Sequence, residues 1–158
     1  MTVRYGELAE RIRGEAEALD GVIRRAEGFW STAATAGKDQ DAYLDAVALN
    51  LHGFYSGVER LFELIARHVD GTLPTGETWH RILLRQMARE FPNRRPAVIS
   101  PETEASLEEY RRFQHLVRNL YATTLAPDRM DPLLKRLPGV WQKARAELVA
   151  FADFLAEL

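Results

Sequence analysis

The chain has 158 residues, a formal net charge of −2 at pH 7 and no cysteine. This length suffices for a hydrophobic core, and we expect residues 1–158 to form one domain. The lack of cysteine excludes disulfide frameworks, thiol nucleophiles and cysteine-ligated metal sites. No apolar stretch is long enough to span a bilayer and no secretory pattern is present, so we expect a cytoplasmic protein without membrane contact.

Apolar residues recur at helical spacing from Val3 to about Trp30, which predicts one long helix although several glycines interrupt its pattern. A break at residues 36–40 precedes a second long helix, which is expected to end near Asp70–Gly71. A loop at residues 71–76 then leads to a shorter helix, predicted at about Glu77–Phe91.

Pro92 and Pro96 delimit a stretch that cannot continue a helix, so we expect an extended connector. Ser100 is a suitable N-cap for a fourth helix running to about Leu125. After a turn at residues 126–131, Pro132 is expected to open a fifth helix with a kink at Pro138–Gly139. Long helices joined by short loops predict an all-α fold, an antiparallel bundle of about five helices.

The fourth predicted helix contains the residues best suited to chemistry. Helical spacing predicts a buried side made of Leu107, Tyr110, Phe113, Val117, Leu120 and Thr124. Arg111, Arg118 and Asn119 lie three or four positions from His115, so their side chains are expected to share another face. Histidine transfers protons near neutral pH and arginine binds phosphate in fork geometry. The group therefore suits a phosphodiester substrate.

A second interpretation of the same helix needs no function. Arg111, Arg112 and Arg118 could form a solvated stripe paired with Glu104, Glu108 and Glu109. His115 would then be a packing residue, because charged helix faces are ordinarily solvated faces.

Arginines outside this helix could extend a basic surface. Candidates for contacts with an RNA backbone are Arg81, Arg85, Arg89, Arg94 and Arg95, together with Arg112, although exposed arginines need no such purpose. Glu77 and His80 match one half of the Glu-x-x-His pattern of di-iron bundles, but no second copy exists, so we expect no metal and no cofactor.

Several ordered blocks of the sequence resemble one known family. These blocks are Phe54–Ala66, Trp79–Met87, Arg95–Ser100 and Gln114–Tyr121. Residues 40–158 resemble the HepT-like proteins of the HEPN superfamily. The resemblance implies an all-helical bundle that forms a homodimer, with the motif helices of two subunits lining a shared cleft.

The resemblance also implies a function. Characterised HepT-like proteins are metal-independent ribonuclease toxins of toxin–antitoxin pairs, acting on RNA such as tRNA or mRNA. Their antitoxin is a small nucleotidyltransferase of the MNT type, which silences the toxin by transferring AMP from ATP to a tyrosine.

The family motif runs arginine, four residues, histidine, one residue, tyrosine. In this chain Gln114 stands at the motif arginine, Asn119 at the histidine and Tyr121 at the tyrosine. An amide has no permanent charge and does not transfer protons at neutral pH. If the chain is a ribonuclease, His115 is expected to be the general base or acid, with Arg118 and Arg111 stabilising the phosphorane.

In this ribonuclease interpretation Asn119 orients the phosphate or ribose, and Tyr121 is the candidate acceptor of AMP. The chief alternative is a HEPN domain that binds RNA or an antitoxin without cleavage, which the departures at Gln114 and Asn119 favour. A helical bundle that only oligomerises is a third alternative.

Overall fold

The computed structural model describes residues 2–118 and 127–158, except for the side chains of Thr2, Val3 and Arg118. Within these residues there are helices and no strands apart from one isolated bridge between Phe91 and Arg95. The elements in chain order are α1 (Thr2–Ala33), η1 (Gly37–Asp39), α2 (Gln40–Ile65), η2 (Ala66–Asp70), α3 (Trp79–Met87), α4 (Pro101–Arg118) and α5 (Pro127–Ala156). The predicted all-α fold is confirmed.

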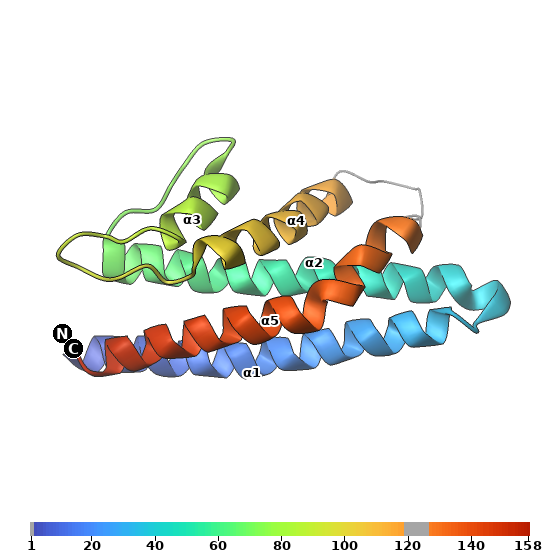
Figure 1. The fold of residues 1–158 in the computed structure, drawn as a ribbon, viewed down its shortest axis with the longest axis horizontal. Coiled ribbons are helices and arrows are strands. Elements are labelled where there is room, and N and C mark those ends of the chain that lie inside the picture. Colours follow the sequence, from blue (N-terminus) through green and yellow to red (C-terminus); the bar gives the residue numbers. More distant parts are fainter. Residues whose placement is uncertain (1, 119–126) are drawn as a thin grey trace.

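Three long helices form the base of the molecule. α1 packs along both α2 and α5, and the shorter α3 and α4 lie over the side of α2 that faces away from α1 (Figure 1). The two termini meet at one end (Figure 1). Because α4 lies over α2 on the outside of the bundle, one of its sides is open to solvent. None of the described helices is both long and apolar enough to cross a membrane.

The predicted first and second helices are confirmed. α1 continues through its internal glycines to Ala33, and α2 is extended by the π-helical turn η2. Gly57 marks the place where α1 and α2 approach closely, because a Cβ atom there would lie 2.5 Å from the Leu19 side chain. The apolar spacing read from the sequence is thus the spacing of the core, in which Ile12, Leu51 and Phe54 are fully buried.

The third helix is shorter than predicted, since α3 ends at Met87 and does not reach Phe91. The connector explains this end: the backbone amides of Val98 and Ile99 donate to the Met87 carbonyl, at 2.9 and 3.2 Å. That carbonyl lies in the last turn of α3, where the carbonyl groups have no hydrogen-bond partner within the helix. The connector after Phe91 is not helical, as predicted, but its first part is a tight turn and not extended, because the amides of Arg94 and Arg95 donate to the Phe91 carbonyl and Asn93 has a φ of 66°.

The predicted turn at residues 126–131 is wrong over most of its length, because α5 already begins at Pro127. Proline is favoured at the first helical position, where its missing N–H has no partner to lose. Pro132 and Pro138 both lie inside α5. The expected start at Pro132 was therefore five residues too late, and the expected end of the fourth helix near Leu125 lies outside the described residues.

A buried ion pair anchors the connector to the end of α2. Arg95 Nε donates to Asp70 Oδ1 at 2.6 Å and Arg95 Nη2 donates to Asp70 Oδ2 at 2.8 Å, with both side chains fully buried. Arg95 also donates to the carbonyls of Gln86 and Arg89, at 3.1 and 2.8 Å. One guanidinium thus joins η2, α3 and the connector that leads to α4.

Replacing Arg95 by methionine leaves the Asp70 carboxylate buried without its cation. We expect Arg95→Met to lower the free energy of unfolding by about 3–5 kcal/mol in urea titrations. The matched control, Lys135→Gln, removes an exposed pair with Asp131 and should cost about 1 kcal/mol or less. Equal losses in the two variants would contradict the anchoring role of Arg95.

Candidate functional site

The start of α4 is set by its sequence as predicted. Ser100 Oγ accepts a hydrogen bond from the Thr103 amide at 3.2 Å, and Pro101 occupies the first turn. Leu107, Tyr110 and Phe113 are buried, which confirms three of the predicted core positions. The Tyr110 hydroxyl donates to the Leu133 carbonyl at 2.7 Å and so ties α4 to α5.

Gln114, the residue at the place of the motif arginine, points into the bundle. Its side chain is 3% exposed, and Nε2 donates to Ser56 Oγ at 2.9 Å. The Ser56 hydroxyl lies 3.5 Å from Nδ1 of His52 on the same helix. Gln114 therefore joins α4 to α2 and does not face solvent.

Arg111 is held by Glu108, one turn earlier on α4. Its side chain is only 11% exposed, and Nε donates to both carboxylate oxygens of Glu108 at 3.0 Å. These hydrogen bonds raise the pKa of Arg111. Partial burial alone would raise the pKa of Glu108, but the hydrogen bonds and the positive charge of Arg111 outweigh it and lower that pKa. Arg111 is therefore paired with a glutamate of its own helix, as the second interpretation of this helix predicted.

A polar cluster that sequence reasoning missed lies beneath this pair. Nδ1 of His80 on α3 is 2.6 Å from Oε2 of Glu59 on α2, and Glu59 is buried. The Tyr55 hydroxyl is buried and has no hydrogen-bond partner among the described residues, and burial raises the pKa of Tyr55. The signal available in the sequence was a glutamate, Glu59, within the apolar pattern of the second helix.

In the second half of α4, the described side chains that are exposed to solvent are those of Arg112 and His115. Both are exposed, with 74% of the Arg112 side chain accessible, and they lie three positions apart on one helix face. Arg112 Nε is 3.5 Å from Oε1 of Glu108, so this ion pair is long, and its arginine is exposed to solvent. Among the described side chains near His115 on α4, the accessible guanidinium is therefore that of Arg112, whereas Arg111 is covered.

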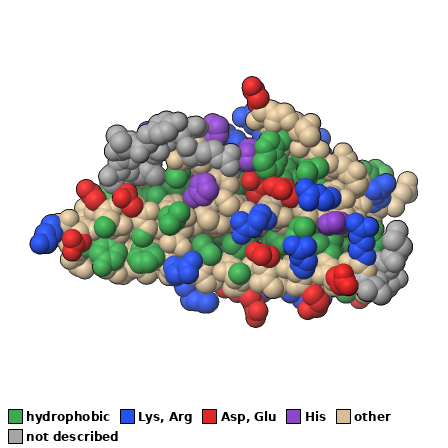
Figure 2. Space-filling view, turned by 180° about the vertical axis from the view of Figure 1, so that it is seen from behind, with side chains coloured by type: hydrophobic (Ala, Val, Ile, Leu, Met, Phe, Trp, Pro, Cys, Tyr) green, Lys and Arg blue, Asp and Glu red, His purple; other side chains and the backbone are tan. Residues whose placement is uncertain are grey.

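Of the arginines predicted to contact RNA, Arg81, Arg85 and Arg112 line one groove, whereas the prediction is wrong for Arg95, which is buried in its pair with Asp70. The groove lies between α3 and α4, with a volume of about 420 Å³, and its lining residues are Arg81, Arg85, Glu104, Ala105, Glu108 and Arg112. Two glutamates share the groove with three guanidiniums, so its net charge is positive. Figure 2 shows basic and acidic side chains interspersed over one face of the molecule, with histidines among them.

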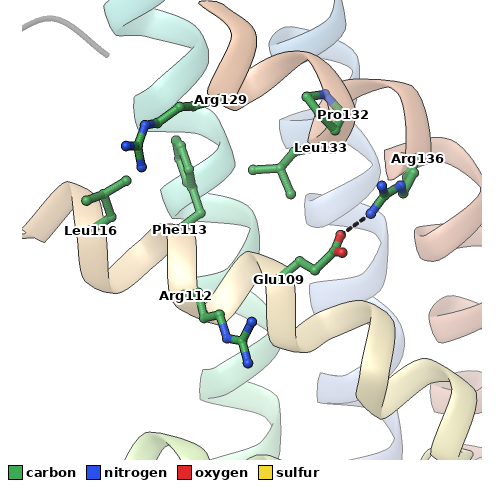
Figure 3. Close-up of a pocket in the computed structure, with 8 residues that line it drawn as sticks. All are labelled: Glu109, Arg112, Phe113, Leu116, Arg129, Pro132, Leu133 and Arg136. Atoms are coloured by element: carbon green, nitrogen blue, oxygen red, sulfur yellow. Dashed lines mark hydrogen bonds and ion pairs between the residues drawn. The ribbon is translucent and has the colours of Figure 1, made fainter. Parts of the chain in front are cut away.

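A second hollow opens on the other side of α4, against the start of α5 (Figure 3). Its lining residues are Glu109, Arg112, Phe113, Leu116, Arg129, Pro132, Leu133 and Arg136. Arg112 lines both hollows. Sequence reasoning missed Arg129 and Arg136, because it assigned Arg129 to a turn and left Arg136 unconsidered.

Part of the predicted site lies outside the described residues. These are Asn119 and Tyr121, with the predicted core residues Leu120 and Thr124, and the side chain of Arg118. His80 of the Glu77 and His80 pattern contacts a carboxylate of another helix, since its Nδ1 lies 2.6 Å from Oε2 of Glu59. No cluster of three or more potential metal ligands occurs in residues 2–118 and 127–158.

A family model described as HepT-like protein matches residues 46–155. The chain belongs to the HepT-like family. The predicted resemblance is confirmed, and the match spans most of α2, all of α3 and α4, and nearly all of α5, so it includes both hollows. No curated protein and no solved structure among those compared matches the chain.

The lowered pKa of Glu108 gives a pH test of the Arg111 pair. A carboxylate with a lowered pKa stabilises the fold above its unfolded pKa, about 4.3, and this contribution is lost as the pH falls through the folded pKa. Wild type should therefore lose more stability than Glu108→Gln between pH 5 and pH 3 in urea titrations. An equal loss of stability in the two proteins over this pH range would show that the pair of Glu108 with Arg111 does not stabilise the fold.

Proposed function

We propose that this chain is the RNA-acting component of a HEPN/MNT-type toxin–antitoxin pair and cleaves RNA without a metal ion. Membership of the HepT-like family supports the first part. The observation that carries the second is the exposure of His115 one helical turn from Arg112, which lines a groove together with Arg81 and Arg85. Guanidiniums can bind the phosphodiester of RNA, and an imidazole beside them can accept the proton of the neighbouring ribose 2′-OH.

In the proposed reaction, His115 accepts the proton of a ribose 2′-OH as its oxygen attacks the neighbouring phosphorus. The new O–P bond replaces the bond to the 5′ oxygen, which leaves and takes a proton from water. Arg112 and Arg118 stabilise the negative phosphorane, and Asn119 orients the phosphate or ribose. Arg111, covered and paired with Glu108, acts as a positioning residue for α4.

Incubation of the purified protein with tRNA and mRNA in excess EDTA tests this mechanism. We expect cleavage by wild type and a loss of about 100-fold or more in His115→Ala, the scale of one general base. The matched control is His68→Ala, a partly buried histidine on η2. Identical backgrounds in wild type and His115→Ala would overturn the mechanism.

A second candidate function is a HEPN domain that binds RNA or its antitoxin without cleavage. The burial of Gln114 against Ser56 favours it, because a neutral, covered amide stands where the motif has a cation. Salt-dependent RNA binding without product in EDTA or in Mg²⁺ would select this function. Cleavage that depends on His115 would exclude it.

We also propose that Tyr121 accepts AMP from an MNT-type nucleotidyltransferase and that two copies of the chain form a dimer around their α4 helices. Co-expression with such an enzyme, followed by intact-mass measurement, should add one adenylyl group to wild type and none to Tyr121→Phe. The control Tyr43→Phe, which changes a partly buried tyrosine of α2, should be modified like wild type. Equal modification of Tyr121→Phe would place the acceptor elsewhere.

A further inference from the structure

The hollow between α4 and α5 combines an apolar floor with a rim of arginines. The apolar part is formed by Phe113, Leu116, Pro132 and Leu133. The basic part of the lining consists of Arg112, Arg129 and Arg136 (Figure 3). Its volume is about 470 Å³, which is within the range of small-ligand sites. A flat apolar group with an attached anion matches this distribution of surface.

The three arginines differ in how their charge is compensated. Arg136 is ion-paired with Glu109 inside the hollow (Figure 3), and Arg112 is loosely paired with Glu108. Arg129 is exposed, and no ion pair to it is recorded among the described residues. The charge most available to a bound anion is therefore that of Arg129, at the upper edge of the apolar floor.

We propose that this hollow is a nucleotide subsite, which holds one base of a single-stranded RNA on its apolar floor and the adjoining phosphate at Arg129. Arg112 lines both this hollow and the α3–α4 groove, so the strand crosses α4 at Arg112 and its backbone continues toward Arg81 and Arg85. The proposal rests on RNA being the substrate, as argued above.

A single strand is required because only an unpaired base can leave the stack and enter an apolar hollow. His115 lies one helical turn from Arg112, the residue that lines both hollows. A nucleotide held in the hollow between α4 and α5 places the next phosphodiester of the strand near the exposed imidazole. The subsite thus positions the strand across the residue proposed to cleave it.

Titration with AMP and with ribose 5-phosphate, followed by amide NMR, tests the subsite without depending on cleavage. AMP should shift the amides of Phe113, Leu116 and Leu133, and ribose 5-phosphate should leave them unchanged. Arg129→Gln should weaken AMP binding about tenfold, the size of one charge-assisted hydrogen bond. Arg25→Gln, which changes an exposed arginine of α1, is the matched control and should bind like wild type.

Equal shifts with both ligands, or equal binding by Arg129→Gln and wild type, would overturn the subsite. Binding of a tetranucleotide separates this result from the proposed function. The subsite predicts that the tetranucleotide binds more tightly than AMP and that Arg129→Gln weakens both. RNA cleavage that depends on His115 but not on Arg129 would overturn the subsite and leave the proposed function standing.

Discussion

The buried pair of Asp70 and Arg95 is the interaction on which the upper layer of the molecule depends. Two charges are removed from water there, and their desolvation is offset because the guanidinium is bidentate to the carboxylate and its remaining donors reach backbone carbonyls. The pair fixes where η2 ends and where the connector enters α4. α3 and the start of α4 flank this point, so the pair helps to position the two helices that form the groove.

On this frame α4 separates its polar residues into two classes. Gln114 and Arg111 form hydrogen bonds within the chain, with Ser56 and Glu108 respectively. These bonds stabilise the packing of α4 on the bundle. Arg112 and His115 are exposed to solvent, and Arg112 lines both hollows. The proposed chemistry therefore uses residues that the fold leaves accessible. The residue at the place of the motif arginine has become part of the helix packing.

Most of the fold could be predicted, because the spacing of apolar residues indicates the buried face of each long amphipathic helix. Ser100, as an N-cap residue, indicates where α4 begins. The start of α5 could not be predicted, since Pro127 and Pro132 are both acceptable first-turn residues and only packing decides between them. The convergence of Arg81, Arg85 and Arg112 was predicted as a basic surface. The burial of Gln114 and the place of Arg129 depend on contacts between helices distant in sequence, which periodicity cannot show.

Photochemical cross-linking of a 4-thiouridine RNA, followed by peptide mapping, tests most directly whether α4 is the RNA-binding element. The account predicts cross-links in peptides from α3, the exposed side of α4 and the start of α5, with Leu116 and Arg129 on the labelled peptides. Cross-links concentrated on α1, or an unlabelled α4 in a protein that binds the RNA, would contradict it.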